Sequence, residues 1–221
     1  MKTVVIVLRS GGDFAFKDVE LITAHINLKW KSDERPRIIC IWDKASFTYD
    51  LGNIKIIPMS TQYQGTWSRI QLYSPEMDVY RPFLYVDLDT AIVQSLENIF
   101  DLIKDPTQYV MLEDFYQKDQ LATGLVWFPK DDLRTVQVWN DWQRNPGPKG
   151  NRMDYYLRKI MTPDTYWQRL TDSIADFKPK RSPLLSVIPK NTNVVCFHGK
   201  PRIFDANIKW VKEYLYAVNL L

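Results

Sequence analysis

Short apolar runs separated by loop residues recur along the chain. Residues 3–8 read Thr-Val-Val-Ile-Val-Leu and lead into a loop that contains Gly11 and Gly12. Continuous β-branched runs of this length predict strands that are buried on both faces. By the same criterion, strands are predicted at 3–8, 37–42, 54–57, 83–86, 109–112, 124–128, 185–188 and 194–197.

Helical periodicity fills most of the intervals between these runs. Val19, Ile22 and Ile26 recur at the spacing of one helix face, which predicts a helix over 18–30. Asp131 is a suitable N-cap for a helix over 131–142. Further helices are predicted at 67–73, 97–103, 154–161 and 163–170, and a last one is predicted after Asp205.

Alternation of strand and helix in the first half predicts an α/β fold. We expect a single domain with a mixed, mostly parallel sheet and helices on both of its faces. Ligands of such sheets bind beyond the carboxyl ends of the strands. This rule directs attention to two loops, 9–13 and 87–90.

Composition narrows the functional classes. The chain has 221 residues, of which 45% are hydrophobic and 25% charged, with a net charge of +3. These values are typical of a globular protein and argue against a nucleic-acid partner. Only two cysteines are present, Cys40 and Cys196, which excludes a disulfide scaffold and a cysteine-rich zinc site. We expect both to be buried thiols in a cytoplasmic protein without a transmembrane segment.

Two carboxylates one residue apart follow the predicted strand at 83–86. Asp87 and Asp89 would point the same way from an extended backbone, where their charges repel unless a cation or water lies between them. A hard divalent cation, Mg²⁺ or Mn²⁺, would suit such oxygen ligands and would bridge to a diphosphate. The alternative is an aspartate pair that caps a turn.

A histidine follows the predicted strand at 194–197. His198 precedes Gly199 and Lys200, so its imidazole could complete a metal site with the two aspartates, and Lys200 could reach a phosphate there. A hydrogen-bonded core histidine is the alternative. The other histidine, His25, lies within a helical pattern and is interpreted as structural.

Two weaker signals lie near the same strand ends. Arg69 on the predicted helix at 67–73 is a candidate phosphate ligand, although most helix arginines are simply solvated. The small residues Ala122, Thr123 and Gly124 would let backbone approach a ligand, with a β-bulge as the alternative.

Taken in order, these segments resemble the GT-A glycosyltransferases, especially the family-8-like enzymes related to glycogenin and their viral and bacterial relatives. The resemblance covers most of the chain and rests on motifs in the family's order and spacing. These are the opening strand and nucleotide loop at 3–13, Trp67-Ser68-Arg69, Phe83-Leu84-Tyr85-Val86-Asp87-Leu88-Asp89-Thr90, Leu96-Glu97-Asn98-Ile99-Phe100, Ala122-Thr123-Gly124-Leu125-Val126-Trp127 and Val195-Cys196-Phe197-His198-Gly199-Lys200-Pro201.

The resemblance implies transfer of a sugar from a nucleoside-diphosphate donor, with UDP favoured, to a hydroxyl of a glycan or glycoconjugate, with retention of configuration. It implies residues 1–110 as the nucleotide-binding half and 111–221 as the half that holds sugar and acceptor. The implied ligands of Mn²⁺ or Mg²⁺ are Asp89 and His198 together with Asp87, for which the ribose is an alternative partner. Lys200 and Arg69 would contact the diphosphate, and Arg9, Ser10 and Gly11 would lie near the base and ribose.

The stretch 150–154 departs from the family pattern. Many relatives carry Gly-Asp-Gln-Asp where this chain reads Gly-Asn-Arg-Met-Asp, so only Asp154 matches an acid of that motif. A carboxylate beside the anomeric carbon would stabilise an oxocarbenium-like transition state. Asp154 is the first candidate for this role and Asp114 the second.

Two other functions fit part of the pattern. A metal-dependent nucleotidyltransferase also places paired acids on a sheet, and Arg9-Ser10-Gly11-Gly12 is a weak version of its phosphate loop. A catalytically silent module that binds a nucleotide or glycan is the third possibility, favoured by the altered stretch at 150–154.

Overall fold

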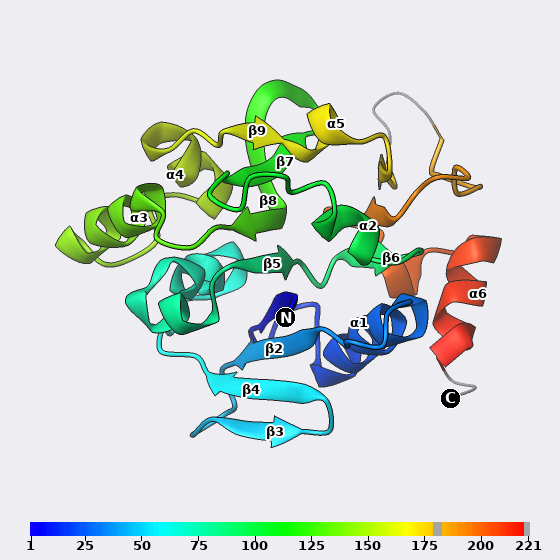
Figure 1. Cartoon of the computed structure of the whole chain (residues 1–221), viewed down its shortest axis with the longest axis horizontal. Coiled ribbons are helices and arrows are strands. Elements are labelled where there is room, and N and C mark those ends of the chain that lie inside the picture. Colours follow the sequence, from blue (N-terminus) through cyan, green and yellow to red (C-terminus); the bar gives the residue numbers. More distant parts are fainter. Residues whose placement is uncertain (179–182, 219–221) are drawn as a thin grey trace.

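The chain folds around one large mixed sheet (Figure 1). The computed structural model describes residues 1–178 and 183–218. The strand order is β3-β4-β2-β1-β5-β8-β7-β9, and the adjacent strands β4, β2, β1 and β5 are parallel. The strands are β1 (Thr3–Leu8), β2 (Arg37–Trp42), β3 (Tyr49–Leu51), β4 (Ile54–Pro58), β5 (Phe83–Val86), β7 (Val110–Asp114), β8 (Gln117–Phe128) and β9 (Thr165–Tyr166).

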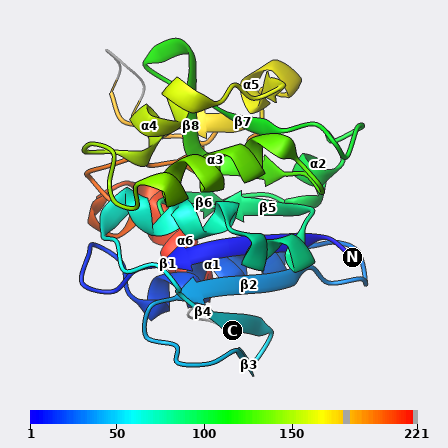
Figure 2. The same ribbon diagram turned by 90° about the vertical axis from the view of Figure 1, so that its left-hand side faces the viewer.

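Helices cover both faces of this sheet, as the alternation predicted. Because successive side chains of a strand point to opposite faces, Val4, Ile6 and Leu8 of β1 pack into one cluster and Val5 and Val7 into another. The first cluster includes α1 (Phe16–Lys29), α2 (Glu97–Phe100) and α5 (Trp167–Leu170). The second includes the 3-10 helices η1 (Gly65–Tyr73) and η2 (Pro75–Tyr80) with α3 (Leu133–Arg144) and α4 (Met153–Ile160) (Figure 2).

A small second sheet joins the carboxyl end of β5 to the last part of the chain. It consists of β10 (Ile174–Asp176), β11 (Val194–Cys196) and β6 (Thr90–Ile92), in the order β10-β11-β6. Residues 87–89 are the short link between β5 and β6, so the Asp-x-Asp segment lies between the two sheets. The last helix, α6 (Lys209–Val218), packs against α1 (Figure 1).

Several predicted elements are corrected by the structure. Residues 185–188 form no strand, and Val187 is 75% exposed. The helix predicted at 163–170 is divided into β9, which pairs with β7, and the short α5. The helix predicted at 97–103 ends at Phe100.

The N-cap of α3 is also one residue later than predicted. Asp131 has a φ of 56°, whereas Asp132 is extended and its side chain accepts hydrogen bonds from the backbone N–H groups of Arg134 and Thr135. An N-cap residue needs an extended backbone to aim its side chain at the first turn, so Asp132 takes this role.

Cys40 and Cys196 are buried free thiols, as expected. None of the helices within residues 1–178 and 183–218 combines the length and the apolar character that a bilayer-spanning helix requires.

Candidate functional site

Asp87 and Asp89 leave the carboxyl end of β5 in the middle of the molecule. The backbone N–H of Asp87 donates to the carbonyl of Gly124 at 3.0 Å, so the strand pairing with β8 continues into the Asp-x-Asp segment. A Cβ on Gly124 would lie 3.1 Å from Leu112 Cδ1 on the neighbouring strand, so a larger residue there would require the Leu112 side chain to shift. Asp87 is half-buried and Asp89 is buried.

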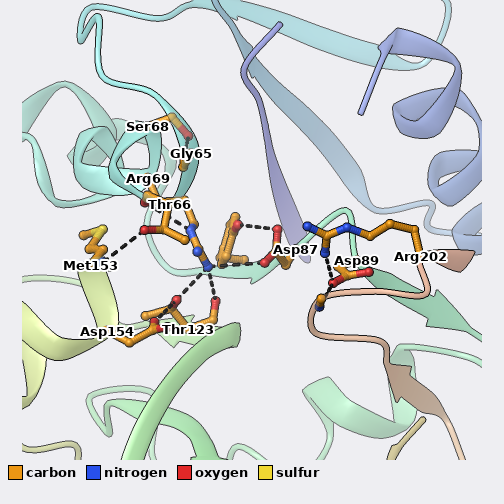
Figure 3. A network of polar contacts seen from close by, with 12 residues as sticks. Gly65, Thr66, Ser68, Arg69, Asp87, Asp89, Thr123, Met153, Asp154 and Arg202 are labelled. Atoms are coloured by element: carbon orange, nitrogen blue, oxygen red, sulfur yellow. Dashed lines mark hydrogen bonds and ion pairs between the residues drawn. The ribbon is translucent and has the colours of Figure 1, made fainter. Parts of the chain in front are cut away.

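Arg69 connects Asp87 to residues from two other elements (Figure 3). From η1, its Nη1 lies 3.3 Å from Asp87 Oδ2 and 2.6 Å from Thr123 Oγ1 on β8. The Thr123 hydroxyl in turn donates to Asp154 Oδ1 on α4. Burial acts to lower the pKa of Arg69, but the carboxylates of Asp87 and Asp154 outweigh it and hold this pKa above its usual value. Arg69 is therefore a permanent buried cation between two of the predicted site acids.

Contacts between η1 and the start of α4 place Asp154 in this network. The Met153 backbone N–H donates to Thr66 Oγ1 at 3.0 Å, and Trp67 Nε1 donates to the carbonyl of Gly150 at 3.0 Å. Asp154 follows in the first turn of α4 and is half-buried. The structure thus brings together Arg69, Asp87 and Asp154, which the sequence predicted as parts of one site.

Asp89 is held by the loop that follows β11. Its Oδ2 accepts from the backbone N–H of Gly199 at 2.8 Å and from Nη1 of Arg202. Its Oδ1 is buried and accepts no hydrogen bond from residues 1–178 or 183–218. Burial raises the pKa of Asp89 to about 6, against the opposite effect of the Arg202 guanidinium.

His198 lies on the same loop, but its ring faces a different acid. Its Nε2 is 2.5 Å from Asp176 Oδ1, and its ring stacks on Phe115 with centroids 5.5 Å apart. The backbone nevertheless runs beside Asp89, since the N–H of Phe197 donates to the Asp89 carbonyl at 2.9 Å.

The three predicted metal ligands do not converge. Within residues 1–178 and 183–218, no three His, Cys, Asp or Glu side chains are grouped so that they could hold a metal ion. The Asp87, Asp89 and His198 ligand set therefore stays a prediction, because the His198 ring contacts Asp176 instead.

The predicted nucleotide loop follows β1 and is fixed to the end of β2. The Ser10 backbone N–H donates to Asp43 Oδ1 at 2.8 Å, and Arg9 Nη1 is 3.3 Å from Asp43 Oδ2. Gly11 has a φ of +85°, which favours glycine. Lys200 is exposed on the loop after β11.

Asp114 belongs to a different set of contacts. It accepts from Arg158 Nη2 at 2.6 Å and from the backbone N–H groups of Tyr116 and Gln117 at 2.8 and 3.1 Å. The two backbone bonds lie in the turn between β7 and β8, whereas Arg158 belongs to α4. Of the two predicted catalytic acids, it is Asp154 that joins Arg69.

Four residues of this region were missed by sequence reasoning. They are Asp13, Asp43, Asp176 and Arg202, each of which contacts a predicted site residue or its loop. The signal for Arg202 was its position two residues after Lys200 in the same basic segment.

Comparisons with known proteins identify the fold. No model of a protein family matches the chain, and no curated protein sequence matches it. Among solved structures, the galactosyltransferase LgtC, in complex with donor and acceptor sugar analogs, superposes with a TM-score of 0.65 at 14% identity, over 99% of this chain and 96% of LgtC.

Two other glycosyltransferases are longer than this chain. The bifunctional WbbM superposes with a TM-score of 0.64 at 10% identity over 100% of this chain and 52% of WbbM. GlyE of Streptococcus pneumoniae superposes with a TM-score of 0.63 at 12% identity over 100% of this chain and 60% of GlyE. The chain thus spans about half of WbbM and 60% of GlyE. These similarities show that the chain has the GT-A fold that its motifs predicted.

Proposed function

We propose that the chain is a glycosyltransferase that moves a sugar from a nucleoside-diphosphate donor, UDP-sugar in the first instance, to a hydroxyl of a glycan or glycoconjugate, with retention of configuration. The observation that carries the proposal is the polar network of Arg69, Asp87, Thr123 and Asp154 at the carboxyl end of β5. It lies where ligands of α/β sheets bind, in a fold that glycosyltransferases share.

The donor would lie across the strand ends of the nucleotide-binding half, residues 1–110 of a single domain. Arg9, Ser10 and Gly11 would contact the base and ribose, because their loop lies at the carboxyl end of β1. Arg69 and Lys200 would contact the diphosphate as cations. Residues 111–221 would supply the sugar and acceptor pocket, and the two buried thiols suit a cytoplasmic enzyme.

A divalent cation, Mn²⁺ or Mg²⁺, would be held by Asp89, Asp87 and His198. The buried Asp89 Oδ1 is an acceptor that no described residue satisfies, and carboxylate oxygens with one imidazole suit either ion. When bound, the cation would supply positive charge that stabilises the leaving diphosphate. The His198 ring would have to turn from Asp176 to take part.

Asp154 is proposed as the carboxylate beside the anomeric carbon. The Thr123 hydroxyl orients one of its oxygens, and the same hydroxyl accepts a hydrogen bond from the buried guanidinium of Arg69. An ionised carboxylate there would stabilise positive charge at the anomeric carbon. Asp114 comes second, because its oxygens already bind Arg158 and the turn after β7.

The test is release of nucleoside diphosphate from a panel of UDP- and GDP-sugars with Mn²⁺, alongside calorimetric binding of UDP. We expect UDP binding and slow donor hydrolysis by the unmodified chain. The variant Asp154→Asn should keep its UDP affinity and lose turnover. UDP binding without turnover of any donor would identify a silent binding module, and release of pyrophosphate from a nucleoside triphosphate would identify a nucleotidyltransferase.

A further inference from the structure

Arg202 contacts the predicted metal ligand Asp89, and three parts of the candidate site meet at its guanidinium. Its Nη1 donates to Asp89 Oδ2, while its Nε and Nη2 donate to Asp13 Oδ2 at 3.1 and 2.9 Å. The guanidinium also lies over the Phe14 ring, 5.0 Å from the centroid. Figure 3 shows the Arg202 side chain extending from the loop after β11 toward Asp89. Arg202 therefore links the nucleotide loop after β1 to the Asp-x-Asp segment.

Each predicted metal ligand is held by another side chain of the protein. Asp89 pairs with Arg202, Asp87 with Arg69, and His198 with Asp176. Asp89 Oδ1, which has no partner within the part of the chain that the structure describes, is buried, so a cation could not reach it while the surrounding side chains stay in place. A divalent ion at this site would have to exchange with one of these partners.

Arg202 is the partner best suited to exchange. Arg69 is buried and tied to Thr123 as well as to Asp87, whereas the Arg202 side chain is 22% exposed and keeps Asp13 as a second anchor. A guanidinium freed from Asp89 can bind two phosphate oxygens at once through its planar fork. The exposed Lys200, two residues earlier on the same loop, is already proposed to contact the diphosphate.

We propose that Arg202 is a donor-binding residue that occupies the metal ligand Asp89 and passes to the diphosphate when cation and nucleotide bind together. This inference rests on the function proposed above and adds to it a coupling between cation binding and nucleotide binding. Cation alone would bind weakly, because it must displace a guanidinium that has no new partner. When the nucleotide is bound, the displaced guanidinium gains the diphosphate as a new partner. Cation and nucleotide therefore strengthen each other's binding by the same factor.

The experiment measures binding rather than turnover. Mn²⁺ binding to the full chain is followed by the electron paramagnetic resonance signal of free Mn²⁺ without nucleotide, and UDP binding is measured by calorimetry with and without Mn²⁺. The variant Arg202→Gln is compared with Arg169→Gln, which removes a surface arginine paired with Asp119 and Glu113 outside the site. Thermal unfolding of each variant reports whether it folds.

Without nucleotide, we expect Arg202→Gln to bind Mn²⁺ roughly tenfold more tightly than the unmodified chain does. The factor by which Mn²⁺ raises the UDP affinity should be smaller in Arg202→Gln than in the unmodified chain, again by roughly tenfold. Arg169→Gln should match the unmodified chain in both. If Arg202→Gln does not fold, Arg202→Lys keeps the charge on Asp89 but lacks the fork. It should bind Mn²⁺ alone like the unmodified chain and UDP with Mn²⁺ more weakly.

The outcomes separate the two proposals. If the unmodified chain binds UDP with Mn²⁺ but Arg202→Gln binds Mn²⁺ alone with equal or lower affinity, the exchange is wrong and the proposed function stands. If Arg202→Lys is used because Arg202→Gln does not fold, a UDP affinity with Mn²⁺ equal to that of the unmodified chain overturns the exchange and leaves the proposed function standing. If the unmodified chain binds no UDP at all, both proposals fail.

Discussion

Thr123→Val removes one buried hydroxyl from the centre of the Arg69 network and changes little else in shape. The hydroxyl accepts from Arg69 Nη1 at 2.6 Å and donates to Asp154. A hydrogen bond to a charged group contributes about 1.5–3 kcal/mol. Arg69 keeps Asp87 Oδ2 at 3.3 Å and the Thr123 carbonyl at 3.4 Å, so we take the lower value for each bond. The expected loss of unfolding free energy is about 3 kcal/mol.

Urea denaturation of Thr123→Val and Thr123→Ser measures this loss against a matched control. Serine keeps the hydroxyl and loses one methyl group, which costs about 1 kcal/mol. In donor hydrolysis, valine should also lower kcat, because Asp154 loses its orienting donor, while UDP affinity stays close to that of the serine variant. Equal unfolding free energies for the two variants would refute the reasoning, since the hydroxyl would then hold neither charged partner.

Two further predictions concern stability away from the site. His25 is buried, its Nε2 donates to the Tyr214 carbonyl at 2.8 Å, and burial lowers its pKa to about 4. Because the unfolded chain binds the proton near pH 6.5, the free energy of unfolding should fall by about 3 kcal/mol in total as the pH drops from 6.5 to 4. In urea titrations across this pH range, His25→Gln should lack this part of the fall. An identical pH profile for His25→Gln and the unmodified chain would contradict the prediction. Asp132→Ala removes the N-cap of α3 and should lower the free energy of unfolding by about 1–2 kcal/mol, whereas Asp131→Asn should leave it almost unchanged. A larger loss in Asp131→Asn than in Asp132→Ala would identify Asp131 as the cap.

The sheet core could be predicted because its strands are buried on both faces. After Thr3 in β1 and Arg37 in β2, the sequences of β1, β2 and β5 are uninterrupted apolar runs, and each strand is buried along most of its length. The edge strand β3 was missed because only one of its residues is even partly buried. The first four residues of β8 are exposed and polar, so only its apolar end was predicted.

The candidate site was predicted as separate pieces, and the structure supplies their pairing. The family resemblance assigned Asp87, Arg69 and Asp154 to one site, but the sequence does not show that Arg69 contacts Asp87 directly and reaches Asp154 through Thr123. Their contact requires η1 and α4 to meet, which depends on bonds such as that from Met153 to Thr66. For His198 the sequence predicted the right loop, beside Asp89, but the partner of the ring is Asp176 on β10, a strand that has no strong apolar pattern of its own.

The most direct test of the account is Mn²⁺-dependent release of UDP from a UDP-sugar by the unmodified chain and by Asp89→Asn. Asp101→Asn is the control, because that carboxylate pairs with Lys2 on the surface, away from the strand ends. We predict that turnover requires Mn²⁺ and falls by more than about a hundredfold in Asp89→Asn, since a metal ion contributes several kcal/mol to charge stabilisation. Turnover by Asp89→Asn equal to that of Asp101→Asn would contradict the central claim that the carboxylate after β5 serves the donor site.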